Sequence, residues 1–359
     1  MILLKRFIFV LISFQAKRIM LDLKSLRELI AIDSPSGYTD KAAAYIVNEL
    51  TDIGLFPFKT HKGAVKCHLG AAPKLAIAAH FDTLGLIISG ISANGRIQFS
   101  LIGSPSLNDI EGCHVRIYTL DEKVYTGTVY LNNPAKHANI NLGTIVRSHE
   151  NMHILLDEVV LNAEDVRSLG IRVGDFICLE TNYRETASGY VKSRFLDNKI
   201  ACYVLFEVAK HYQKLQQKVP VEFFFSNYEE VGHGAAGGFA ESIEELLVLD
   251  MGVLGDSCES TELFCSICAK DSSGPYDYSM RKKLTDLATQ HNIPVRTDIY
   301  PYYSSDGSAA WRAGAQFRVA LIGAGVGASH GSERSHQVGI EASIRLTIAY
   351  IDDVVSRLS

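Results

Sequence analysis

Residues 221–232 read VEFFFSNYEEVG, an apolar strand followed by two adjacent glutamates, Glu229 and Glu230. Neighbouring carboxylates repel each other, so placing both after a strand costs free energy unless a cation lies between them or one carries a proton. A metal hydrolase needs both kinds of carboxylate, because one binds the metal and the other transfers protons. The alternative is a solvated pair, since glutamates usually lie on the surface. The rest of the chain has to decide between these two interpretations.

The segments around this stretch alternate between helix and strand. Helical patterns lie at residues 23–32, 41–50, 197–214, 241–245, 280–291 and 340–358, and strand patterns lie at residues 64–69, 74–79, 221–225, 246–249 and 317–322. Such alternation is typical of a central, mostly parallel sheet with helices on both faces. The strands at 74–79 and 221–225 are almost entirely apolar, as the central strands of such a sheet should be. We therefore predict an α/β fold.

The pattern changes between residues 85 and 186. Short β-branched runs alternate there with turn signals such as Ser92-Ala93-Asn94-Gly95. Several short strands at this spacing predict a small β-barrel or sandwich. We interpret residues 85–186 as an inserted β domain, a small barrel, that divides a catalytic domain into residues 20–84 and 187–359.

Side chains that can bind a metal follow the predicted central strands. The carboxyl ends of the strands in an open α/β sheet line one crevice, so residues far apart in the sequence converge there. The candidates are His80, Asp197, Glu230, Asp250, His330 and His336. Imidazole and carboxylate ligands favour zinc, cobalt or manganese over calcium. Two ions about 4 Å apart share a bridging carboxylate, for which Asp197 is the candidate, and Asp82 is placed to orient the His80 imidazole.

Each of these residues also has a simpler interpretation. A single histidine is usually a hydrogen-bonded core residue, Asp197 fits a helix N-cap, and His336 fits a loop. Their joint occurrence at successive strand ends is what favours a metal site.

Five segments together indicate a family. They are residues 79–85 (AHFDTLG), 194–199 (RFLDNK), 228–232 (YEEVG), 248–250 (VLD) and the late-histidine region. In this combination the chain resembles the tetrahedral (TET-type) aminopeptidases, a family of dinuclear metallo-aminopeptidases that includes glutamyl and leucyl enzymes, from about Met20 to the C-terminus. The resemblance implies that His80, Asp197, Glu230, Asp250 and a late histidine bind two metal ions, with Asp197 bridging. It also implies that Glu229 is the general base and that Asp82 supports His80.

Three features depart from the family pattern. Asn198-Lys199 replaces the Asp-Arg that usually follows the bridging aspartate. The last motif, residues 328–336 (ASHGSERSH), leaves His330 or His336 as the final ligand, and its His-small-x-Glu pattern favours His330. Residues 272–278 and 302–306 are similar to a branch linked to the osmolyte N-acetylglutaminylglutamine amide, so the substrate preference stays open.

The composition limits the class of protein and of partner. The 359 residues are 47% hydrophobic and 21% charged, with a net charge of −5, which is ordinary for a soluble chain with a large core. No basic stripe indicates a nucleic-acid partner. Seven scattered cysteines predict reduced thiols and a cytoplasmic location. Residues 1–19 form an extension whose apolar run is too short to span a membrane. Met20 is the predicted functional start, and a weak secretion signal is the alternative.

The predicted function is a dinuclear metal-dependent aminopeptidase that hydrolyses N-terminal residues from short peptides, with Glu229 taking a proton from the attacking water. Zinc is the first choice of metal, with cobalt or manganese as alternatives. One rival function is a metal-dependent deacylase or amidase for an N-blocked dipeptide or osmolyte. A rival of another class is a non-catalytic assembly or binding protein. The resemblance implies a homo-oligomer, up to a dodecamer, assembled through the inserted domain.

Overall fold

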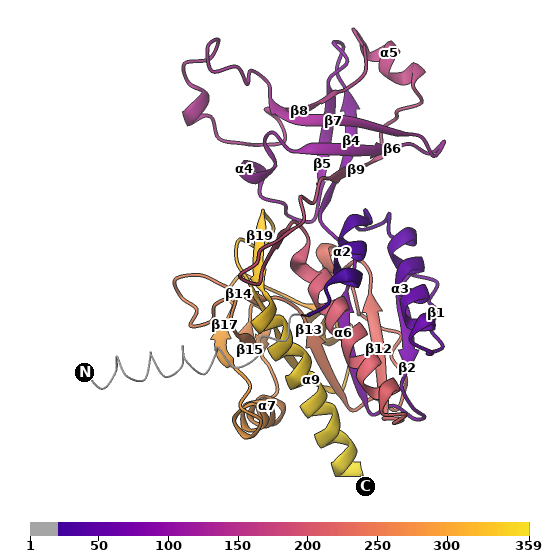
Figure 1. Cartoon of the computed structure of the whole chain (residues 1–359). Coiled ribbons are helices and arrows are strands. Elements are labelled where there is room, and N and C mark those ends of the chain that lie inside the picture. The colour runs from indigo at the N-terminus through magenta and orange to yellow at the C-terminus, as the bar shows by residue number, and fades with distance from the viewer. Residues whose placement is uncertain (1–20, 359) are drawn as a thin grey trace, which may run out of the picture.

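The computed structural model describes residues 21–358, which form a large layered α/β unit and a separate barrel (Figure 1). The predicted extension, residues 1–19, and the predicted start at Met20 lie outside the described residues. Within residues 21–358, no helix is both long and apolar enough to cross a membrane.

The large unit contains a ten-stranded sheet whose centre is parallel. Its order is β1 (Phe58–Lys59), β2 (Val65–His68), β12 (Val221–Ser226), β3 (Leu75–His80), β13 (Glu245–Leu249), β18 (Arg318–Val326), β15 (Cys265–Asp271) and β16 (Gly274–Pro275). Two further strands are β14 (Gly252–Val253), which pairs with β18, and β17 (Val295–Ile299), which pairs with β15. Strands β12, β3, β13 and β18 run parallel to one another, whereas β2 and β15 flank them antiparallel. The predicted mostly parallel sheet is confirmed.

Apolar layers cover both faces of this sheet. Along β12, Phe223 and Phe225 belong to one core cluster and Phe224 to another, as the alternation of side chains along a strand requires. The first cluster lies under α2 (Lys24–Ala31), α3 (Asp40–Asp52), α6 (Leu196–Lys214), α7 (Tyr278–Gln290) and α9 (Gln337–Leu358). The second lies under α8 (Asp306–Arg312) and neighbouring loops. The sheet is therefore buried on both sides, as predicted.

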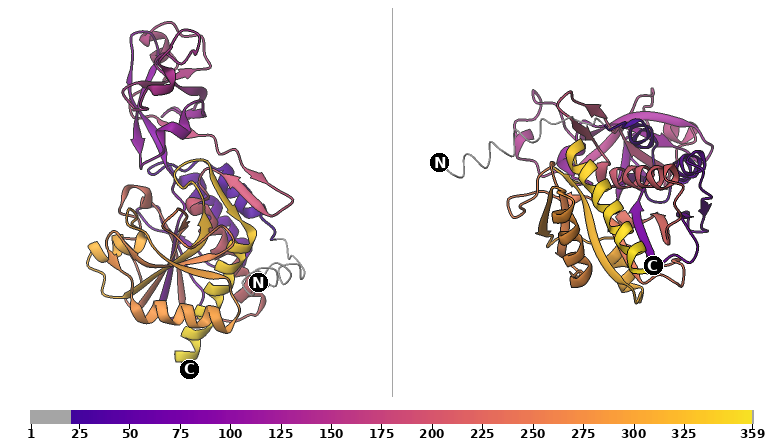
Figure 2. Two further views of the ribbon diagram at one scale, coloured as in Figure 1. Left: turned by 90° about the vertical axis from the view of Figure 1, so that its left-hand side faces the viewer. Right: turned by 60° about the horizontal axis from the view of Figure 1, so that its bottom comes forward.

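The inserted segment forms a closed six-stranded barrel. Its strand order is β4 (Gly85–Ile91), β5 (Ile97–Ile102), β8 (Met152–Leu156), β7 (Val124–Leu131), β6 (His114–Tyr118) and β9 (Phe176–Leu179). The connections include α4 (Leu107–Ile110), η1 (Leu142–Thr144) and α5 (Ala163–Ser168). The barrel has its own apolar core and stands beyond one end of the large sheet (Figures 1 and 2). The predicted inserted barrel is confirmed.

The connection back from the barrel pairs with the large unit. Strand β10 (Arg184–Glu185) pairs with β11 (Tyr190–Ser193), and β11 pairs with β19 (Glu333–His336). This small sheet therefore joins the end of the predicted insert to the catalytic part. The exact domain limits at residues 84/85 and 186/187 stay predictions.

Two local predictions are corrected. The helix predicted at residues 241–245 is wrong: residues 241–242 form a turn, residues 243–244 are irregular, and β13 begins at Glu245. The amides of Glu244 and Glu245 donate to the Lys74 carbonyl, so pairing beside β3 overrides helix propensity. Helix α6 begins at Leu196, but Asp197 has non-helical backbone angles (φ −75°, ψ 104°), so Asp197 does not open a regular helix.

Candidate metal centre

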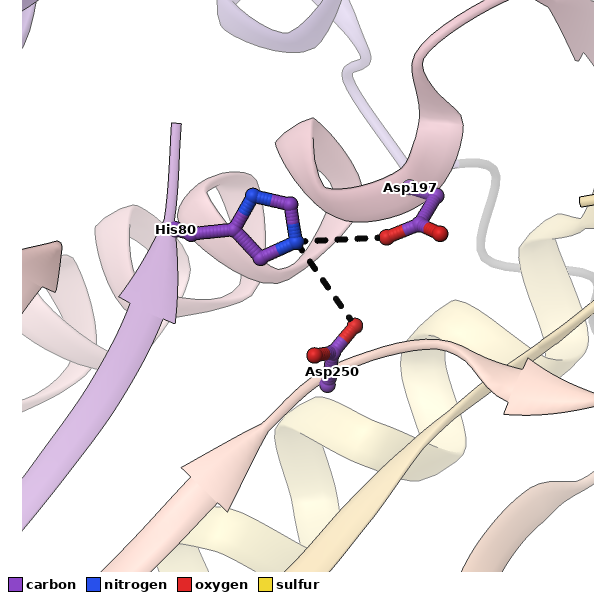
Figure 3. A group of neighbouring side chains, drawn as sticks. All are labelled: His80, Asp197 and Asp250. Atoms are coloured by element: carbon purple, nitrogen blue, oxygen red, sulfur yellow. Dashed lines mark ion pairs between the residues drawn. The ribbon is translucent and has the colours of Figure 1, made fainter. Parts of the chain in front are cut away.

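Three buried side chains meet at the carboxyl ends of the central strands (Figure 3). His80 is the last residue of β3, Asp250 follows β13, and Asp197 stands at the start of α6. The His80 Nε2 atom lies 3.3 Å from Asp197 Oδ1 and 3.9 Å from Asp250 Oδ1. One ligand atom from each of the three lies within 4.8 Å of the other two. One imidazole facing two carboxylates is a donor set that suits a divalent transition metal.

A second cluster lies on the other side of Asp197. His330 Nε2 is 3.7 Å from Asp197 Oδ2 and 3.7 Å from Glu230 Oε2. Asp197 thus presents one carboxylate oxygen to each imidazole, which is the arrangement that a bridging ligand requires. The Glu230 Oε1 atom is buried and has no hydrogen-bond partner. A buried acceptor without a donor is costly, so the residues present fit a cation at this second position.

The glutamate pair lies in the site rather than on the surface. The side chains of Glu229 and Glu230 are only 13% and 3% exposed, which excludes the solvated pair. Glu229 Oε2 lies 3.7 Å from His80 Nε2, so this carboxylate lies beside the first cluster.

Asp82 supports the site in two ways. Its backbone carbonyl lies 3.0 Å from His80 Nδ1, which directs Nε2 of the ring toward the carboxylates. Its carboxylate accepts hydrogen bonds from the backbone amides of Glu229 (3.1 Å) and Glu230 (3.4 Å), and from the Ser36 hydroxyl. The expectation that Asp82 orients His80 needs a refinement, because the carbonyl makes that hydrogen bond while the carboxylate holds the glutamate segment.

Backbone strain accompanies three of the site segments. Phe195, Tyr228 and His330 have positive φ angles of 66°, 70° and 64°. A non-glycine residue in this left-handed region costs about 1–2 kcal/mol. Phe195 lies two residues before Asp197, Tyr228 directly precedes Glu229, and His330 is itself a candidate ligand. Such strain concentrates where the chain must place a functional side chain.

The carboxylates make the site strongly negative. Burial, with the charge of neighbouring carboxylates, raises the pKa of Glu229 and of Glu230 well above the usual range, although His80 opposes the rise. Burial and the charge of Asp197 raise the pKa of Asp250 to about 7. Burial opposes protonation of His80, but the surrounding carboxylates outweigh it and raise the His80 pKa well above its usual value. Burial likewise opposes ionisation of Asp197, yet hydrogen bonding to His80 lowers its pKa. A divalent cation would relieve the repulsion among these buried carboxylates.

We expect a divalent metal to stabilise the folded protein more at high pH than at low pH. Carboxyl groups with raised pKa values bind more protons in the folded than in the unfolded state. The metal-free protein therefore loses stability as the pH rises from about 4, the unfolded value, through the folded value of about 7 for Asp250. Thermal unfolding with added zinc and with a chelator, at about pH 5 and about pH 8, measures the effect. An increase in Tm that is equal or smaller at the higher pH would contradict it.

The two late histidines have different surroundings. His336 lies in β19, where its Nε2 is 2.9 Å from the Ser188 carbonyl, its Nδ1 accepts from the Val338 amide, and its ring packs edge-on against Tyr190. His330 is the histidine that the structure brings to Asp197 and Glu230. We therefore retain His330, and not His336, as the candidate ligand.

Glu333 is a site residue that was not among the predicted ones. It is 3% exposed, and its two oxygens accept from the backbone amides of Asp197 (3.0 Å) and His330 (3.1 Å). Glu333 thereby fixes the backbone of two candidate ligands relative to each other. The signal available in the sequence was the spacing of three residues after His330.

Asn198 and Lys199, which depart from the family pattern, direct their side chains to backbone carbonyls rather than to the proposed metal ligands. Asn198 donates to the Leu249 carbonyl at 2.8 Å. Lys199 is fully buried and its Nζ donates to the carbonyls of Leu29 and Ile32, at 3.0 and 2.7 Å. Burial lowers the Lys199 pKa to about 8. Both side chains tie α6 to its neighbours, so the departure from the family pattern leaves the ligand set intact.

A cavity of about 590 Å³ opens over both clusters. Its floor carries Asp197, Glu229, Glu230, Asp250 and His330, and its remaining walls include Met251, Val253, Ile299, Tyr300 and Tyr303. The cavity is large enough for the end of a peptide.

Histidine and carboxylate side chains that converge at the strand ends of an α/β sheet are typical of metal-dependent hydrolases. The chain belongs to the M42 glutamyl aminopeptidase family, whose sequence pattern matches residues 63–346. It is therefore an aminopeptidase-family hydrolase, and this family is metal-dependent.

A relative agrees with this family assignment, and two solved structures agree with the fold. The chain is 38% identical to YhfE of Bacillus subtilis (strain 168) over 331 residues, which cover 91% of this chain and 96% of YhfE. Its fold matches that of a TET aminopeptidase from Thaumarchaeota archaeon SCGC AB-539-E09, with a TM-score of 0.84 and 20% sequence identity. The match covers 94% of this chain and 98% of that one. The fold also matches that of the TET1 peptidase of Pyrococcus horikoshii, with a TM-score of 0.82 and 21% sequence identity. This match covers 92% of this chain and 98% of the TET1 chain.

Proposed function

We propose that this chain is a dinuclear metal-dependent aminopeptidase that removes N-terminal residues from short peptides, with Glu229 as its general base. The observation that carries the proposal is the position of Asp197, whose two oxygens face the imidazoles of His80 and His330 at 3.3 and 3.7 Å. Glu229 lies beside this pair in the same cavity.

The proposed ligands divide into two sets that share Asp197. His80 and Asp250 complete the first, and Glu230 and His330 complete the second. Two divalent ions, with zinc as the first choice and cobalt or manganese as alternatives, would supply Lewis acidity and lower the pKa of the attacking water. Metal analysis that found no divalent ion on the purified protein, even after incubation with zinc, would favour the rival non-catalytic binding protein.

Glu229 has the environment that a proton carrier needs. Its buried carboxylate has a raised pKa, so it accepts a proton near neutral pH more readily than an exposed glutamate does. The hydrogen bond from its amide to Asp82 fixes its backbone. We propose that Glu229 takes a proton from the attacking water and later delivers it to the leaving amine. The carboxylates around it also attract the cationic α-amine of a peptide, which favours exopeptidase action.

We expect peptides with an uncharged N-terminal side chain to be better substrates than those with an acidic one. Among residues 21–358, no lysine or arginine lines the cavity, and its walls are apolar, aromatic or small polar side chains. An acidic side chain would enter it without a counter-charge, at a cost of several kcal/mol. We therefore expect kcat/KM for Leu- and Met-anilides to exceed that for the Glu-anilide by at least about 100-fold.

The same set of anilide substrates, extended by blocked dipeptides, separates the rival functions. N-acetylated dipeptides belong in it, because preferential cleavage of a blocked substrate would favour the deacylase. A Glu-anilide that is cleaved as fast as the Leu-anilide would contradict the substrate preference while leaving the aminopeptidase proposal standing.

We also propose that the chain forms a homo-oligomer through the barrel. The Pyrococcus horikoshii TET1 peptidase can assemble into a tetrahedron or a large octahedral shell. The barrel carries exposed apolar side chains, among them Ile140, Val146, Val159 and Leu161, which are 79–96% exposed, and such surfaces are typical of interaction sites. Sedimentation velocity on the purified protein tests this proposal, and a monomer at all concentrations would refute it. The cytoplasmic location stays a prediction.

A further inference from the structure

The imidazole of His330 is held by the connection between the barrel strands β5 and β6. After β5 ends at Ile102, Ser104 reaches the catalytic unit. The His330 Nδ1 atom lies 3.0 Å from the Ser104 carbonyl and 2.9 Å from the Ser104 hydroxyl. The Ser106 amide donates to the His330 carbonyl at 2.9 Å. These contacts hold the ring from its Nδ1 side, which leaves Nε2 directed at Asp197 and Glu230.

Asp109, in the short helix α4, connects two ligand-bearing segments. Its Oδ2 accepts from Arg194 Nη1 at 2.8 Å and from the Ser332 hydroxyl at 3.1 Å, and its carbonyl accepts from Arg194 Nη2 at 2.6 Å. Arg194 is only 6% exposed and precedes Asp197 by three residues. Ser332 follows His330 by two. A buried arginine needs a counter-charge, and Asp109 supplies it while fixing both segments.

Gly103, at the start of the same segment, packs against the backbone of Glu230, another proposed ligand of the second site. Gly103 has a φ of +69°, and a Cβ there would lie 3.1 Å from the Glu230 carbonyl and 2.5 Å from Leu84 Cδ2. Residues 103–109 therefore approach the segments that carry Asp197, Glu230 and His330. Within the described chain, no hydrogen bond of Ser104, Ser106 or Asp109 reaches His80 or Asp250.

We infer that residues 103–109 of the insert are a positioning element for the second metal site, with Asp109 as its main positioning residue. The inference rests on the proposed dinuclear centre, and adds that one of its two sites depends on how the barrel joins the catalytic unit. Groups that orient metal ligands from outside the coordination sphere change metal affinity by about 10–100-fold when they are mutated. Loss of Asp109 should therefore weaken the second site more than the first, because the second has two supported ligands, Asp197 and His330, and the first only Asp197.

The experiment measures the two metal affinities separately. The parent protein and the variants Asp109→Asn and Ser104→Ala are freed of metal with a chelator and titrated with zinc by calorimetry, with zinc content checked by mass spectrometry. Asp121→Asn is the matched control, because Asp121 is a barrel aspartate whose only ion pair among residues 21–358 is with the exposed Arg172, at 3.4 Å. For Asp109→Asn we expect the second dissociation constant to rise by about 10–100-fold and the first, which shares only Asp197 with it, to rise clearly less. Ser104→Ala keeps the backbone carbonyl of residue 104 and loses only the hydroxyl, so its second dissociation constant should rise by less.

The possible outcomes are distinct. Two unchanged constants in Asp109→Asn would overturn the inference, and so would an equal loss at both sites, since that is what a general structural role predicts. If Asp109→Asn does not fold, Ser104→Ala decides by the same two constants. A parent protein that binds fewer than two zinc ions would refute the dinuclear proposal itself, whatever the variants do.

Discussion

The Glu229→Gln variant should bind metal as the parent protein does and hydrolyse its best peptide substrate more slowly by at least about 100-fold, and up to about 10,000-fold. The amide keeps the size and position of the side chain but cannot accept a proton. Glu229 lies 3.7 Å from His80 without being needed in either set of proposed ligands. The measurement is kcat for the Leu-anilide together with the metal content of the same sample.

Two comparisons make this result specific. Glu230→Gln should lose metal as well as activity, because Glu230 faces His330 in the second cluster. Glu244→Gln, at a glutamate that is 59% exposed and pairs with Lys74, should retain both. Near-normal turnover by a metal-loaded Glu229→Gln protein would refute the assignment of the base.

The Asp197→Asn variant should lose at least one of the two ions and nearly all activity. In the described part of the chain, Asp197 is the one carboxylate that pairs with both imidazoles, and the substitution removes its charge. Charge stabilisation by the metal pair contributes several kcal/mol to catalysis, and each 1.36 kcal/mol is a factor of ten in rate, so we expect kcat/KM to fall by at least about 1,000-fold. Metal content and kcat/KM are measured on one preparation, and circular dichroism checks that the variant is folded.

A folded Asp197→Asn protein that still holds two ions with parental affinity would show that the carboxylate does not bridge. Thermal unfolding provides an independent measurement. The increase in Tm that zinc gives the parent protein should shrink in the variant, because binding to the folded state is what stabilises it.

Much of the site could be predicted, because several of its residues directly follow segments whose own sequence pattern predicts a strand. A strand pattern followed by a polar residue locates His80 and Asp250 directly, since parallel strands bring their carboxyl ends to one edge. The alternation of apolar segments likewise predicts the layered sheet and the inserted barrel. These features require only that each segment form its own strand or helix.

What could not be predicted depends on contacts between distant segments. The sequence favours His330 over His336 only by a short pattern, whereas the pairing of β19 with β11, which fixes His336 opposite Tyr190, could not be predicted. The strands β15 and β17 were missed because their pairing, rather than a clear sequence pattern, defines them. The support of His330 by Ser104 joins residues 226 positions apart, and no sequence pattern indicates such a contact.

The position of β3 has a consequence for how this chain folds. The strand lies between β12 and β13, which are its only partners among the described strands. Both are synthesised after the whole barrel. Until then, both edges of an apolar strand are unpaired, and unpaired edges invite aggregation. Within residues 21–358, the six barrel strands pair only with one another, so the barrel can fold before β3 has its partners. We expect assembly of the central sheet, and not the barrel, to be the slow step on the ribosome, since contacts between distant segments form slowly.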